Sequence, residues 1–172
     1  SAELSEPAGT FAHSENLVSN ELHFVNLARA LRRSGGVYIG VGPEQNFTYI
    51  AAMQPKMAFI TDIRRGNLHM HLMYKALFEL SADRADFVSR LLTKPRPPGL
   101  TTKSTAADLM NAYWDIKTSD VGTYKKNLED IYNVLSKTHG WTLSSKTVTA
   151  SRTSITRSTG SGRPLPTARA RR

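Results

Sequence analysis

Apolar residues along the first third of the chain follow two different spacings. Over residues 20–33 they recur every three positions, which predicts a helix that Ser19 caps. Two apolar runs, Val37–Val41 and residues 57–62, predict short strands, and the first of them is expected to be fully buried. Residues 46–53 lie between the runs and have helical spacing. The pattern therefore predicts helix, strand, helix and strand in succession.

The second half of the body is predicted to be mostly helical. Residues 67–92 keep a helical pattern, and Ser81 with Asp83 can start a new helix inside it. The segment 94–99, Lys-Pro-Arg-Pro-Pro-Gly, predicts a stiff linker that interrupts the helices. Further helices are predicted from Ser104 or Thr105 to about Ile116 and over residues 121–138, and residues 141–143 can begin a strand.

Composition excludes several classes of protein and site. The 172 residues suffice for one domain with a buried core, and no apolar run approaches the roughly 18 residues that a membrane span needs. Because cysteine is absent, disulfides, thiolate metal sites and a cysteine nucleophile are excluded. The sequence motifs of α/β-hydrolases, P-loop NTPases and zinc peptidases are also absent. His69 and His71 would point to different sides of a helix, so no metal site is predicted.

The net charge of +9 is concentrated at one end of the chain. Residues 146–172 hold seven of the 23 basic residues and no acidic residue, whereas residues 1–145 have a net charge of only +2. The tail is rich in Ser, Thr, Arg, Gly and Pro, and we expect it to be disordered; residues 1–18 are expected to form a flexible arm. A basic arm for nucleic acid or anionic lipid is one interpretation, and a solvated tail is another. A third is truncation or a frameshift after about Lys146, because the composition is typical of a GC-rich gene read out of frame.

The most informative stretch is residues 35–67, which predict a strand, a glycine turn, a helix and a second strand. Such a βαβ unit has parallel strands and a right-handed crossover. Gly40 and Gly42 in the turn allow a ligand to approach the backbone. Asp62 follows Gly40 by 22 residues and ends the second strand, where a carboxylate can accept the hydroxyl groups of a ribose. The pattern thus indicates a site for an adenosine-type nucleoside at the carboxyl ends of the strands.

Further polar residues flank this predicted site. Glu44 and Asn46 follow the glycine turn and can contact the cofactor, although Asn46 can equally cap the helix. Arg64, Arg65 and Asn67 follow the second strand and can bind a carboxylate or phosphate of the substrate. The alternative for the arginine pair is that it braces the carboxylate at the strand end. Likewise, a tight turn and a helix cap are the structural alternatives for the glycines and for that carboxylate.

The segment resembles the class I S-adenosylmethionine-dependent methyltransferases, in which a glycine-rich loop follows the first strand and an acid ends the second. It also resembles an uncharacterised family of bacterial proteins with a methyltransferase-like domain, over roughly residues 17–143. The shared strings are G-V-G-P-E-Q-N-F-T-Y at 40–49, D-I-R-R-x-N at 62–67 and H-L-x-Y-K-A-L-F at 71–78.

This resemblance implies S-adenosylmethionine as cofactor, with Gly40 and Gly42 as loop glycines and Asp62 as the ribose acid. Two positions depart from the methyltransferase pattern. Tyr38 stands where an acidic residue usually precedes the first glycine, and Glu44 stands where the third glycine is expected. The contact that this region normally makes with the methionine amine is therefore not supported by the sequence.

Together these features predict an α/β, Rossmann-like fold that is incomplete, with the first βαβ unit followed by mainly helical additions. The partial domain is expected over residues 19–145, with a helical insertion at about 94–140. The implied function is that of a methyltransferase-like protein that binds S-adenosylmethionine or a related adenosine nucleotide. The alternatives are a non-catalytic binding protein, a non-functional fragment of the fold, and a nucleic-acid binder acting through the tail. A cytoplasmic location is expected, and Ser1 in place of Met is compatible with a removed N-terminal signal.

Overall fold

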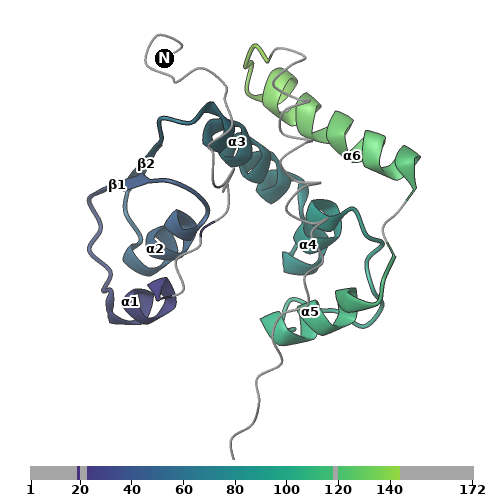
Figure 1. Cartoon of the computed structure of the whole chain (residues 1–172), viewed down its shortest axis with the longest axis horizontal. Helices are drawn as coiled ribbons and strands as arrows, with labels where there is room; N and C mark the ends of the chain where they lie inside the picture. The colour runs from purple at the N-terminus through teal and green to yellow at the C-terminus, as the bar shows by residue number, and fades with distance from the viewer. Residues whose placement is uncertain (1–18, 20–22, 118–119, 144–172) are drawn as a thin grey trace, which may run out of the picture.

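The computed structural model describes residues 19, 23–117 and 120–143, so the expected arm at 1–18 and tail at 146–172 lie outside it. The described residues form a mixed α/β architecture with a small parallel sheet (Figure 1). Its elements in chain order are α1 (Phe24–Ala30), β1 (Val37–Val41), α2 (Gln45–Met53), β2 (Met57–Thr61), α3 (Arg65–Leu80), α4 (Arg84–Leu92), α5 (Ala106–Trp114), α6 (Val121–Asn133) and the π-helical segment η2 (Val134–Thr138).

The two strands and the helix between them confirm the predicted βαβ unit with parallel strands. β1 and β2 pair along their whole length, from Val37 opposite Met57 to Val41 opposite Thr61. In Figure 1, α1 and α2 lie next to each other at the sheet end of the molecule. These two helices are in contact, since the rings of Phe24 and Tyr49 meet edge to face at 6.5 Å. The carboxyl ends of both strands therefore reach the same edge of the sheet.

The prediction that the first strand is fully buried is wrong. Val37, Ile39 and Val41 are 61%, 72% and 69% exposed. Side chains alternate between the two faces of a strand, and α2 covers only the face that carries Tyr38 and Gly40. The opposite face has no cover within the described part of the chain, and Met57 and Phe59 of β2 are exposed there as well.

The hydrophobic core lies among the helices and not on the sheet. One buried cluster joins α3 to the end of α6 and to η2, which run alongside α3 in Figure 1. A second cluster joins α4 to α5 through Ala85, Leu109 and Tyr113. The members of the first cluster are Met70, Met73, Ala76, Leu77, Ile131 and Leu135.

Most predicted helix boundaries are confirmed, and capping residues explain them. The side chain of Asp83 accepts a hydrogen bond from the backbone N–H of Asp86 at 2.8 Å, which starts α4 after the break that follows α3. Thr105 and Asp108 form a reciprocal capping box at the start of α5. The first helix is shorter than predicted, because Leu31 is extended and ends α1 at Ala30; residues 20–22 lie outside the described residues.

The end of the last helix also differs from the prediction. Residues 121–138 are helical as predicted, but the final turn from Val134 widens into η2. Residues 141–143 do not form the expected strand. Gly140 has a φ of +68°, and the backbone N–H of Trp141 donates to the carbonyl of Leu135 at 3.1 Å. This N–H therefore closes the helix end and is not available for strand pairing.

Candidate functional site

The structure brings the two halves of the predicted nucleoside site to one edge of the sheet. Val41 pairs with Thr61 in the last position of the parallel ladder, and the N–H of Gly42 donates to the carbonyl of Thr61 at 3.2 Å. The glycine turn leaves β1 at this point, and Asp62 follows β2 at the same point. Residues more than 20 positions apart in the sequence thus become neighbours, as the spacing predicted.

Asn46 holds the glycine turn from inside. Its Nδ2 donates to the carbonyl oxygens of Val41 at 3.1 Å, Gly42 at 3.1 Å and Pro43 at 2.7 Å. Its Oδ1 accepts a hydrogen bond from the hydroxyl of Tyr38 at 2.7 Å. The side chain is 1% exposed, and both of its polar atoms are bonded within the protein. The geometry therefore assigns Asn46 to the conformation of the turn.

Of the two glycines predicted for the turn, Gly40 lies within β1 and only Gly42 lies in the turn, and the two are needed for different reasons. A Cβ at Gly40 would overlap Oδ1 of Asn46 and would lie 2.6 Å from a ring carbon of Tyr38. Gly42 has a φ of +89°, which side-chain-bearing residues rarely adopt, but the nearest atom to a Cβ there is Nε2 of Gln45 at 3.5 Å. Gly40 thus makes room for the side chain of Asn46, whereas Gly42 makes the turn.

Asp62 is held by the start of α3. Its Oδ1 accepts the backbone N–H of Arg64 at 2.7 Å, its Oδ2 accepts Nδ2 of Asn67, and Nε of Arg64 lies 3.6 Å from Oδ1. The Asp62 side chain is only 11% exposed. The predicted substrate residues Arg64 and Asn67 therefore contact the predicted ribose acid directly, as in the bracing alternative. Arg65 is exposed at the first position of α3.

Glu44 and Gln45 lie where the turn leads into α2. The carboxylate oxygens of Glu44 lie 2.9 and 3.2 Å from the backbone N of Ser19, which donates to them. The side-chain oxygen of Gln45 is buried without a hydrogen-bond partner in the structure. Burial raises the pKa of Tyr74 to about 12, and the nearby charge of Glu44 adds to this effect.

His71 is a site residue that the sequence did not reveal. Its Nε2 lies 2.9 Å from the carbonyl oxygen of Gly42, 29 residues away in the chain. A carbonyl oxygen only accepts hydrogen bonds, so Nε2 carries the proton and Nδ1 of the neutral ring is an acceptor. This Nδ1 is buried without a partner, as is Oδ1 of Asn67 one helical turn earlier. No spacing rule connects a turn after β1 with a histidine in α3, and only the fold brings them together.

A comparison with protein families decides the classification. A family model matches residues 16–153, which is most of the chain and includes every described element. The chain belongs to the family described as a domain of unknown function, DUF7790. No curated protein matches the sequence.

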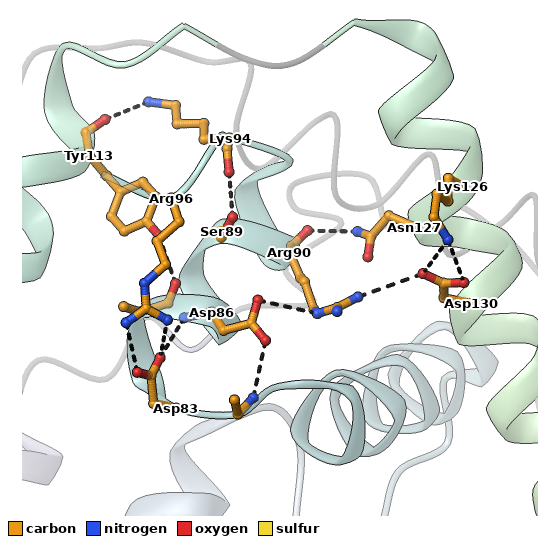
Figure 2. Close-up of polar contacts among 12 residues, drawn as sticks. Asp83, Asp86, Ser89, Arg90, Lys94, Arg96, Tyr113, Lys126, Asn127 and Asp130 are labelled. Carbon is orange, nitrogen blue, oxygen red and sulfur yellow. Dashed lines mark hydrogen bonds and ion pairs between the residues drawn. The ribbon is translucent and has the colours of Figure 1, made fainter. Parts of the chain in front are cut away.

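The DUF7790 region contains a second group of polar side chains, centred on α4 (Figure 2). Arg96 in the Pro-rich linker forms a bidentate salt bridge with Asp83, with N–O distances of 2.9 and 2.8 Å. Nζ of Lys94 donates to the carbonyl of Tyr113 at 2.8 Å. The hydrogen bonds from Arg96 and from the N–H of Asp86 lower the pKa of the Asp83 carboxyl. Arg96 is thus paired with Asp83 and Lys94 is bonded to a backbone carbonyl, and these contacts fasten the linker to the helices.

The described residues of the DUF7790 region give no sign of a metal centre or a membrane span. No three His, Asp or Glu side chains gather there in a way that could hold a metal ion. No helix within the same residues combines the length and the apolar character needed to cross a bilayer. The glycine turn and its surroundings are therefore the strongest candidate site in this part of the chain.

Proposed function

We propose that this protein has a Rossmann-like fold and binds S-adenosylmethionine, or a related adenosine nucleotide, at the carboxyl edge of β1 and β2. One observation carries the proposal: the glycine turn that follows β1 and Asp62, which follows β2, leave the parallel βαβ unit at the same edge of the sheet, where the N–H of Gly42 donates to the carbonyl of Thr61. Nucleosides bind α/β folds at this edge, with the ribose on the acid and the backbone of the turn close to the ligand.

The donor and acceptor groups present fit a nucleoside. A carboxylate offers about four acceptor positions, and two of those on Asp62 are used by Arg64 and Asn67. These two bonds orient the carboxylate and leave acceptor positions for ribose hydroxyl groups. Unpartnered buried acceptors on Gln45 and Asn67 add to the hydrogen-bonding capacity around the turn.

S-adenosylmethionine supplies an electrophilic methyl group when it is bound, so the protein's contribution would be to position the acceptor in line with that group. Arg64 and Arg65 at the start of α3 can hold a carboxylate or phosphate of the substrate. No described residue is assigned as a general base for this reaction.

A binding protein without catalysis is the second candidate, and the loop favours it. Tyr38, at the position where the methyltransferases carry an acid, uses its hydroxyl on Asn46. Glu44 accepts a hydrogen bond from the backbone of Ser19. Both departures from the methyltransferase pattern are therefore built into the protein's own contacts. Cofactor binding without methyl transfer to any acceptor would identify this second function.

Isothermal titration calorimetry with S-adenosylmethionine and S-adenosylhomocysteine tests the proposal on the full chain. Asp62→Asn keeps an acceptor for Arg64 but removes the charge, and we expect it to weaken binding by about tenfold or more. The matched control is Asp120→Asn, because Asp120 likewise accepts backbone N–H groups next to a helix but lies at the start of α6. Absence of binding to the folded wild-type chain at millimolar ligand would contradict the proposal. Equal loss in both variants would contradict the assignment of Asp62.

A further inference from the structure

A pocket of about 340 Å³ opens between α2, β2 and α3, and no step of the proposed function uses it. Its walls come from Phe47, Ile60 and Phe78, and His71, Lys75 and Glu79 complete the lining. His71 is also the residue that holds the carbonyl of Gly42. The pocket is therefore joined to the glycine turn through a single side chain.

The aromatic walls of the pocket are fixed by further ring contacts. Phe47 meets His71 and Phe78 edge to face, with ring centres 5.4 Å apart in both pairs. Phe78 is stacked on Phe87 at 4.8 Å, and Phe47 also meets Tyr74 edge to face at 5.6 Å. A second layer of rings thus supports the walls of the pocket. Such edges and faces suit a flat aromatic guest.

The charged groups at the rim balance one another. Nζ of Lys75 pairs with Glu79, and Nε2 of His139 lies 2.8 Å from the same carboxylate. The hydrogen bonds from Lys75 and His139 lower the pKa of the Glu79 carboxyl, which is therefore ionised and paired at neutral pH. A charged ligand finds no unpaired opposite charge among the lining residues. An uncharged ligand that leaves this arrangement intact fits better.

We propose that this pocket binds a small uncharged aromatic molecule with one ring or two fused rings. The volume lies at the lower end of the range for small-molecule sites, about 300–1,000 Å³, which limits the size of the guest. The ring has two possible sources, the adenine of the nucleoside cofactor or a separate acceptor molecule. Both sources rest on the proposed function, whereas binding of the ring itself does not.

Saturation-transfer NMR with indole as the probe tests the pocket in the full chain. Ile60→Phe fills the pocket with apolar volume, and Phe78→Ala removes one wall; each should weaken indole binding by about tenfold. The matched control is Phe59→Ala, because Phe59 is 52% exposed, close to the 51% of Phe78, but lies on the uncovered face of the sheet. Circular dichroism establishes that each variant is folded. Because Ile60→Phe fills the pocket and Phe78→Ala opens it, either variant can test the proposal if the other does not fold.

Two further measurements identify the source of the ring and distinguish the pocket proposal from the nucleoside proposal. Competition between indole and S-adenosylhomocysteine supports the adenine as the guest, whereas simultaneous binding supports a separate molecule. Asp62→Asn should lose the nucleoside and retain indole, so the nucleoside site can fail while the pocket stands. The pocket proposal is overturned if folded wild-type protein does not bind indole at millimolar concentration. It is also overturned if Phe59→Ala weakens binding as much as Ile60→Phe does.

Discussion

Replacement of Asn46 by alanine tests the central structural claim about the glycine turn. The side chain makes four hydrogen-bond contacts: the two hydrogens of Nδ2 are shared among three carbonyl oxygens of consecutive residues, and Oδ1 accepts the hydroxyl of Tyr38. Asn46→Ala removes all four bonds and leaves a space at a position that is 1% exposed. The turn that joins β1 to α2 would then lose its internal support.

The expected loss of stability depends on which bonding partners of Asn46 retain another hydrogen bond in the variant. At about 1 kcal/mol for each net hydrogen bond, the two hydrogens of Nδ2 and the bond from Tyr38 set an upper value of about 3 kcal/mol. The carbonyl of Gly42 keeps the bond from His71, and that of Pro43 keeps the backbone N–H of residue 46 at 3.3 Å. The losses at these two carbonyl groups are therefore partly compensated. We expect the variant to lower the free energy of unfolding by about 1–3 kcal/mol.

Urea unfolding followed by far-UV circular dichroism measures this change. The control is Asn111→Ala, because Asn111 is an exposed residue within α5 and its replacement should change the free energy of unfolding by about 0.5 kcal/mol or less. Tyr38→Phe removes only one of the four bonds and should cost about 1 kcal/mol. If Asn46→Ala and Asn111→Ala unfold at the same urea concentration, the buried hydrogen bonds do not stabilise the turn and the reasoning is refuted.

Two other predictions follow from the same contacts and from the α4 linker. Gly40→Ala displaces the side chain of Asn46, so it should lower the free energy of unfolding about as much as Asn46→Ala does, and the double variant should lose little more. Gly42→Ala meets backbone strain alone and should lower the free energy of unfolding by about 1–2 kcal/mol in the same urea assay. Asp83 has a pKa lowered below its ordinary value of 3.8, so its ion pair stabilises the fold above that pH and is lost as the pH falls through the lower folded value. The stability difference between wild type and Asp83→Asn should therefore shrink in acid, and a difference independent of pH would contradict the pairing.

Local sequence signals predicted the elements well wherever a cap or a breaker marks the boundary. Asp83 and Thr105 start helices as expected, because their side chains accept the first free N–H groups of a helix whatever the tertiary context. The end of the first helix at Ala30 and the widening at Val134 were not predicted. No distinctive residue marks these positions, and the packing of η2 against α3 became known only from the fold.

Burial was predicted less well than secondary structure. An unbroken apolar run such as Val37–Val41 is typical of a strand covered on both faces. An apolar sequence shows that a strand can be buried, whereas its actual burial depends on whether other elements cover one face or both. Here α2 covers one face, and Ile39 is 72% exposed on the other. The strand at Val37–Val41 was therefore predicted correctly, and its burial was not.

The candidate site shows the same division between local and distant contacts. The spacing from Gly40 to Asp62 correctly placed two loops at one sheet edge, but Asn46, assigned to either a cap or a ligand, proved to be bonded to the turn itself. His71 was missed because its partner is 29 residues away.

The location of the core gives these polar contacts unusual weight. The buried apolar clusters lie among α3, α4, α5, α6 and η2, and the sheet contributes no side chain to them. A two-stranded sheet is marginal by itself, since it gains little from apolar burial on one covered face. The βαβ unit is therefore held by the bonds of Asn46, by the contact of His71 with the turn and by the ring contacts of Phe47 with α3. Because His71 belongs to the helix that carries the core, it transmits the rigidity of α3 to the loop where a ligand would bind.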